Sequence, residues 1–99
     1  SEMMKVAAMA SAWHLKIAPH TSASALSTAA SVHVLSALPN GHIYEADVSR
    51  INAFRDELSS EPFRIKDGFI RASDRPGLGI EVDESIIERY PLILGASYQ

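Results

Sequence analysis

Two residues that can exchange protons occupy corresponding places in the chain. His20 follows a short apolar stretch at residues 15–18, and Glu45 lies in the next such stretch, residues 42–47. An imidazole, with an unperturbed pKa of about 6.5, can give or take a proton at neutral pH. A carboxyl group can act as acid or base, or, kept protonated in a dry site, donate a hydrogen bond to a developing oxyanion. These residue types indicate proton-transfer chemistry; the structural alternatives are a helix-capping or carbonyl-bonded histidine and a solvated strand-end carboxylate.

The elements expected around this pair alternate between helix and strand. Short strand signals lie at residues 15–18, ended by Pro19, and at residues 42–47. Each follows a segment with apolar residues at helical spacing, first Met3, Val6, Ala7, Ala10 and Trp13, then Leu26, Ala29, Ala30, His33, Val34 and Leu38. This order predicts parallel strands joined by a helical crossover. Because neighbouring parallel strands lie about 4.8 Å apart and end at one edge, we expect His20 and Glu45 to face one cavity.

The pattern changes after residue 47, so the chain is divided into residues 1–47 and residues 48–99. The second part is expected to contain a short helix around Phe54, a hairpin over residues 63–72 with its turn at Asp67-Gly68, and a last helix capped by Asp83 and ended by Pro91. Two parallel strands followed by a hairpin leave both sheet edges unpaired. The chain is therefore expected either to self-associate or to form the end of a longer barrel or open sheet.

Two neighbours of the pair are candidates for binding a substrate. Thr21 directly follows His20, and Asp47 lies two residues after Glu45. For Asp47 the alternatives are that it orients a cation or pairs with Arg50. The remaining histidines lack such a position, and His33, in the middle of a helical segment among apolar residues, is expected to be a partly buried side chain with its hydrogen bonds satisfied.

Composition excludes several classes of protein. Nine basic against twelve acidic residues give a net charge of −3, which does not favour nucleic-acid binding. No apolar run is long enough to span a membrane. The absence of cysteine excludes disulfides and thiolate metal sites and fits a reducing cytoplasm. The carboxylates and histidines lack metal-ligand spacing, and the serines lack a Gly-x-Ser-x-Gly elbow, so neither a self-contained metal site nor a serine hydrolase is expected.

A series of motifs gives the chain a family resemblance. The order of the motifs at residues 17–20, 32–40, 44–47 and 75–83 resembles the C-terminal part of the enolase superfamily, notably the acid-sugar dehydratases of its mandelate racemase/muconate lactonizing enzyme branch. The resemblance implies an α/β fold, the last two strands and helices of a (β/α) TIM-type barrel. Residues 48–99 would then form a return segment whose hairpin packs on a capping domain that lies outside this chain.

The resemblance also implies roles for the pair. His20 would be the acid/base at the end of the seventh barrel strand, and Glu45, at the end of the eighth, would hydrogen-bond the carboxylate of a small-molecule substrate and its enediolate oxygen. Their separation of 25 residues fits the dehydratase-like members better than some racemases. The cofactor would be Mg²⁺, with its ligands upstream of Ser1.

Those ligands would lie on earlier strands, so the 99-residue chain alone is expected to be inactive. It would associate with that upstream part or form a homo-oligomer. The alternative is a non-catalytic oligomerising α/β module, in which exposed sheet edges and the small-residue helix drive association.

Overall fold

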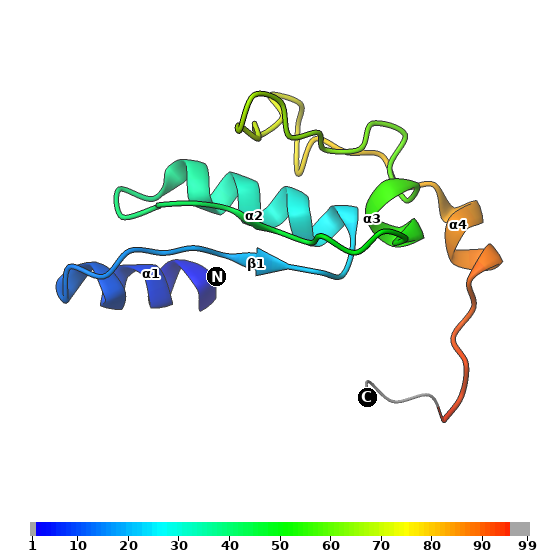
Figure 1. Ribbon diagram of the computed structural model, residues 1–99, viewed down its shortest axis with the longest axis horizontal. Coiled ribbons are helices and arrows are strands. Elements are labelled where there is room, and N and C mark those ends of the chain that lie inside the picture. Colours follow the sequence, from blue (N-terminus) through cyan, green and yellow to red (C-terminus); the bar gives the residue numbers. More distant parts are fainter. Residues whose placement is uncertain (1, 96–99) are drawn as a thin grey trace.

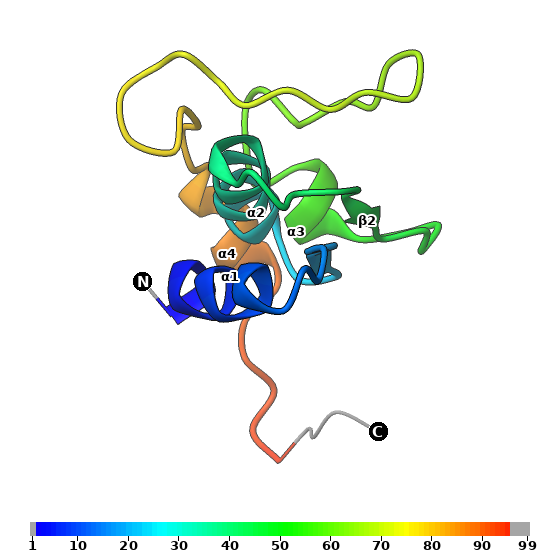
Figure 2. The same ribbon diagram turned by 90° about the vertical axis from the view of Figure 1, so that its left-hand side faces the viewer.

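The computed structural model describes residues 2–95 of the chain (Figure 1). The helices and strands are α1 (Glu2–Ala12), β1 (His20–Thr21), α2 (Ala25–Ala37), β2 (Glu45–Ala46), α3 (Ala53–Asp56) and α4 (Glu84–Arg89). Helices α1 and α2 lie on the same side of the two strands (Figure 2). This mixed α/β arrangement, with strands joined through α2, agrees with the predicted C-terminal part of a barrel.

The two strands pair in parallel, as predicted. His20 lies opposite Glu45 and Thr21 opposite Ala46. An additional parallel bridge joins Ile17 to Gly41. The prediction that the first strand ends before Pro19 was wrong, because pairing continues on its far side. Proline cannot donate a backbone hydrogen bond, but its carbonyl accepts one from the amide of Glu45 at 3.0 Å.

Helix α2 is built to pack closely. Ser24 caps its first turn, with a side-chain oxygen 3.4 Å from the amide of Ser27. Its buried face consists of small or β-branched residues, namely Ala25, Thr28, Ala29, Ser31 and Val32. Nε2 of His33 donates to the carbonyl of Leu78 at 3.2 Å, so the expectation of a partly buried, hydrogen-bonded histidine is confirmed. The Ser- and Ala-rich composition of this segment therefore serves close packing.

A tight turn carries the chain from α2 to the second strand. A Cβ atom at Gly41 would lie 2.7 Å from the carbonyl oxygen of Leu35, so only glycine fits there. The side-chain amide of Asn40 donates to the carbonyls of Ala7 and Leu15, at 3.1 and 3.0 Å. Asn40 therefore fixes the amino-terminal end of the strand pair to α1.

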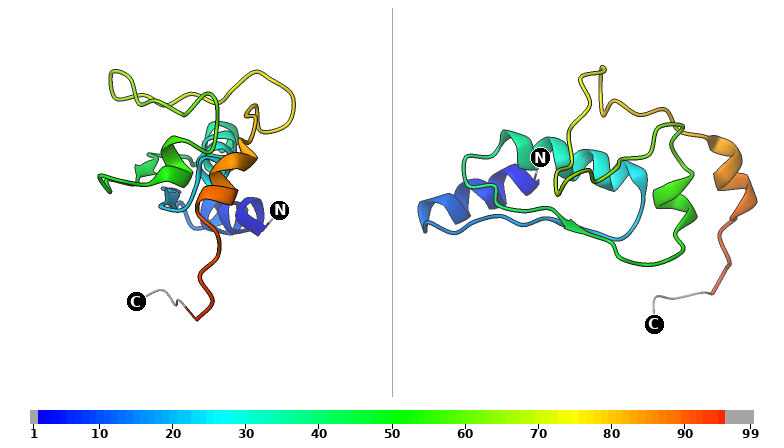
Figure 3. Two further views of the ribbon diagram at one scale, coloured as in Figure 1. Left: turned by 90° about the vertical axis from the view of Figure 1, so that its right-hand side faces the viewer. Right: turned by 45° about the horizontal axis from the view of Figure 1, so that its top comes forward.

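The second part of the chain contains little regular structure. Asp67 and Gly68 have positive φ angles of 53° and 80°, as the predicted turn requires, but the expected hairpin is reduced to one bridge between Lys66 and Phe69. Helix α4 begins at the predicted cap, Asp83. After α4 the chain leaves the rest of the molecule in an extended segment (Figure 3).

The chain is looser than a self-sufficient domain of its size. It exposes 7690 Å², against about 5,500 Å² for a compact monomer of this mass. Its radius of gyration is 14.9 Å, against about 12.6 Å for a compact chain of this length. Several large apolar side chains are at least 79% exposed, namely Trp13, Val48, Ile51, Leu92 and Leu94. An exposed apolar surface of this extent is typical of a surface that contacts other protein segments.

A small hydrophobic core holds α4 against the start of α2. Ile86 of α4 is 3% exposed and packs with Ala25 and Leu58, whereas Ile87 beside it is 50% exposed. Ile86→Ala is expected to lower the free energy of unfolding by about 2–5 kcal/mol, because it removes buried methyl groups and leaves a cavity.

The matched control is Ile87→Ala, for which we expect a loss below about 1 kcal/mol. Urea unfolding of both variants beside the unsubstituted chain measures the difference. Equal losses would show that this core does not hold α4 in place.

Candidate active site at the ends of the parallel strands

The parallel pair brings together the two residues predicted to exchange protons. His20 and Glu45 are register partners, and Nδ1 of the imidazole lies 3.7 Å from Oε1 of the carboxyl group. Partners in register point to the same face of a sheet. Their side chains are 52% and 66% exposed, so both are open to a ligand. The geometric prediction of neighbouring parallel strands is confirmed, while the catalytic roles of the two residues stay predictions.

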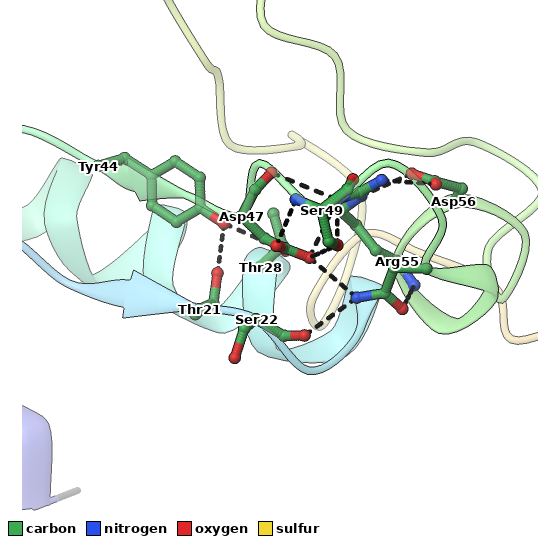
Figure 4. Close-up of polar contacts among 9 residues, drawn as sticks. Thr21, Ser22, Thr28, Tyr44, Asp47, Ser49, Arg55 and Asp56 are labelled. Atoms are coloured by element: carbon green, nitrogen blue, oxygen red, sulfur yellow. Dashed lines mark hydrogen bonds and ion pairs between the residues drawn. The ribbon is translucent and has the colours of Figure 1, made fainter.

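Thr21 belongs to the opposite face of the strands. Its hydroxyl group forms a hydrogen bond with the hydroxyl group of Tyr44 (Figure 4). The Tyr44 hydroxyl group in turn donates to Oγ1 of Thr28 at 3.3 Å. Because side chains alternate along a strand, these contacts toward α2 place His20 and Glu45 on the face turned away from α2. The hydroxyl of Thr21 therefore helps to join the strands to α2, and its predicted contact with substrate stays a prediction.

Asp47 lies within a polar network just after β2 (Figure 4). Its side chain is only 11% exposed. Its carboxylate accepts hydrogen bonds from Nη1 of Arg55 at 2.9 Å and from Nδ2 of Asn52 at 3.0 Å. The amide and hydroxyl of Ser49 also donate to it, at 2.9 and 2.7 Å. The alternative that Asp47 pairs with Arg50 was wrong, because the turn through Ser49 directs the carboxylate toward α3, where Arg55 lies.

These donors keep Asp47 ionised. The hydrogen bond from Asn52, those from the amide and hydroxyl of Ser49, and the charge of Arg55 hold the pKa of the carboxyl group well below its usual range. An ionised, donor-saturated carboxylate is suited to fixing a loop. Its predicted role in substrate binding stays a prediction.

Asn52 and Arg55 belong to this network but are not among the site residues predicted from the sequence. Asn52 caps α3, since its Oδ1 accepts from the amide of Arg55 at 3.1 Å. An asparagine directly before a short helical segment is a recognisable capping signal. Nothing in the sequence, however, indicates that its amide group also reaches the loop after β1.

The residues present do not fit a metal site of their own. Between residues 2 and 95 no three His, Cys, Asp or Glu side chains are grouped so that they could hold an ion. His20 and Glu45 supply only two donors, fewer than the three or more protein ligands or the oxygen cage typical of such sites. Within the same residues, no helix has the length and hydropathy needed to cross a bilayer.

Comparison with known proteins gives consistent matches. Residues 1–86 match the family described as enolase C-terminal domain-like. An arabinonate dehydratase from Saccharolobus solfataricus is 37% identical over 90 residues, covering 91% of this chain and 24% of the relative. The chain thus spans about a quarter of the length of this curated relative.

Two solved structures share the fold over nearly the whole chain. A member of the enolase superfamily from Polaromonas sp. JS666 is 47% identical, with a TM-score of 0.88, over 99% of this chain and 26% of that one. A protein from Burkholderia xenovorans strain LB400, solved with magnesium and fumarate, is 34% identical, with a TM-score of 0.78, over 90% of this chain and 22% of that one.

Proposed function

The chain belongs to the enolase C-terminal domain-like family of the enolase superfamily, and from this we propose that it forms the C-terminal part of a larger barrel enzyme. In this proposal the enzyme abstracts the proton next to the carboxylate of a sugar acid, and the main reaction that follows is the elimination of water rather than racemisation. The arabinonate dehydratase relative supports dehydration, while the solved structure from Burkholderia xenovorans, described as an L-alanine-DL-glutamate epimerase, keeps racemisation as the alternative. The two parts of the chain, residues 1–47 and 48–99, would be the final βα units and the return segment.

One observation carries the proposal: His20 and Glu45 lie 3.7 Å apart on register partners of a parallel strand pair. At this separation both side chains can reach neighbouring atoms of one small molecule. We assign His20 the proton transfer, because an imidazole can hold or release a proton at neutral pH. We assign Glu45 a hydrogen bond to the substrate carboxylate and to the enediolate oxygen that develops from it.

The role of Glu45 requires protein from outside this chain. A carboxyl group donates to a carboxylate only when it carries a proton, which at neutral pH requires a site shielded from water. Both side chains of the pair are more than half exposed here, so the proposal needs another segment to cover them. The large exposed area and the exposed apolar side chains support such a cover.

The cofactor belongs to the same proposal. The described residues of this chain do not form a metal site, so the Mg²⁺ expected from the resemblance would be held by residues outside it. The structure solved with magnesium and fumarate supports a divalent ion and a small carboxylate as the ligands of such a barrel. We also propose that Thr21 and Asp47 contact the substrate. The proposal further includes a cytoplasmic location and self-association.

Activity of the isolated chain and of the full-length protein tests the proposal. With Mg²⁺, a panel of sugar acids and deuterated water, we expect the full-length protein to exchange the α proton and to form a 2-keto-3-deoxy acid. We expect no exchange and no product from the 99-residue chain, because the groups that stabilise the enediolate are not on it.

Deuterium from the solvent detects proton abstraction in both reactions, because it enters C2 of the sugar acid in racemisation and C3 of the keto acid in dehydration. The keto acid itself identifies dehydration. A chelator added to the full-length protein is the control for the metal. Turnover by the isolated chain, or none by the full-length protein, would contradict the proposal. Stable oligomers of the isolated chain in light scattering, without activity of the full-length protein, would favour the oligomerising module instead.

A further inference from the structure

Few backbone hydrogen bonds hold the candidate pair in place. Strands β1 and β2 contain two residues each, and the amide of Glu45 donates to the carbonyl of Pro19 at 3.0 Å. The ladder ends at the next pair, Thr21 and Ala46, only one residue past His20 and Glu45. The relative position of His20 and Glu45 therefore depends on contacts made by the two loops that follow them.

One side chain, Asn52, joins these two loops. Its Nδ2 donates to the backbone carbonyl of Ser22 at 3.0 Å and to Oδ2 of Asp47 at 3.0 Å. Ser22 lies two residues after His20, and Asp47 lies two residues after Glu45. A single amide group thus connects corresponding points beyond the ends of β1 and β2.

The loop after β2 is itself firmly held. Nη1 of Arg55 donates to the carboxylate of Asp47 and to the backbone carbonyls of Asp47 and Ser49, at 2.9, 3.3 and 2.9 Å. The side chains of Asp47 and Arg55 are 11% and 24% exposed, so the hydrogen bonds between these two residues are partly shielded from water. Asn52 therefore connects the loop after β1 to a loop that is itself held by several hydrogen bonds.

We propose that Asn52 is a positioning residue that sets the separation of His20 and Glu45 by joining the loops after β1 and β2. It acts through these loops and does not touch the substrate. This inference rests on the proposed function, since it requires the imidazole and the carboxyl group to act on one molecule. Displacing a catalytic group by about 1 Å can lower a rate about 100-fold.

Asn52→Asp in the full-length protein separates this role from the capping of α3. Aspartate keeps an oxygen that caps the helix but loses both donated hydrogen bonds and sets a negative charge beside Asp47. We expect kcat to fall about 10- to 100-fold, with a smaller change in KM. We also expect the amide of Glu45 to exchange with solvent about tenfold faster, because its strand is less well held.

The matched control is Asn40→Asp at the opposite end of the strand pair. Asn40 also donates two hydrogen bonds, to the carbonyls of Ala7 and Leu15, so this substitution likewise removes two donated hydrogen bonds and adds a negative charge, away from the candidate site. We expect a comparable loss of stability, with kcat within about twofold of the unsubstituted protein.

If the unsubstituted protein is active and the two variants have the same kcat, whether unchanged or equally reduced, the inference is overturned. An inactive unsubstituted protein would contradict the proposed function instead. In that case the exchange of the Glu45 amide still decides the inference, which is overturned if Asn52→Asp leaves it as slow as before.

Discussion

Replacing His20 with asparagine in the full-length protein is expected to lower kcat by about 10²–10⁴-fold, the usual contribution of a general acid or base. Asparagine keeps a polar side chain of similar size but cannot transfer a proton. Because the His20 side chain is 52% exposed in the 99-residue chain, the same substitution there should leave the free energy of unfolding within about 0.5 kcal/mol. Steady-state rates on the preferred sugar acid, together with α-proton exchange in deuterated water, measure the effect.

His42→Asn is the control for this result. His42 is an exposed histidine near the start of the second strand segment, away from the carboxyl ends of the strands. It should retain kcat within about twofold. If His20→Asn behaved like this control, the imidazole would not be the acid/base, and the carboxyl ends of the strands would need another proton carrier.

The outline of the fold could be predicted because local signals and tertiary packing agree over residues 1–47. The spacing of Leu26, Ala29 and Val34 is helical and predicts α2, although its buried face consists of the small or β-branched residues Ala25, Thr28, Ala29, Ser31 and Val32. These residues allow α2 to approach the strands closely. The strand was predicted to end before Pro19 because proline lacks the backbone N–H group that a strand donates. This lack matters only where the N–H group would face the neighbouring strand. At Pro19 the carbonyl group faces that strand and accepts a hydrogen bond from the amide of Glu45.

The network behind the pair could not be predicted because it depends on how loops fold back. The cation nearest to Asp47 in sequence is Arg50, but the hydrogen bonds from Ser49 turn the carboxylate away from it and toward Arg55. The second hydrogen bond of Asn52 crosses to Ser22, thirty residues earlier. Periodicity reports which face of an element is buried, and it carries no information on such contacts between loops.

The second large effect is expected for Glu45. In the proposed role its carboxyl group donates a hydrogen bond to substrate oxygens, and removing one such donor costs about 10²–10³-fold in rate. Glu45→Met, which has a side chain of similar length and no donor, is therefore expected to lower kcat/KM by that amount. Glu45→Gln keeps an N–H donor and should lose only about tenfold. The full-length protein and the same sugar acid are used for both variants.

Comparison of the two variants distinguishes hydrogen bonding from proton transfer. A side chain that moves a proton cannot be replaced by an amide, so equal losses in Glu45→Gln and Glu45→Met would assign Glu45 to acid/base chemistry. Glu81→Met, at an exposed carboxylate in the second part of the chain, is the control and should lie within about twofold of the unsubstituted protein. If neither Glu45 variant lost more than this control, Glu45 would lie outside the reacting site. The 3.7 Å approach to His20 would then be a surface ion pair of little energetic consequence.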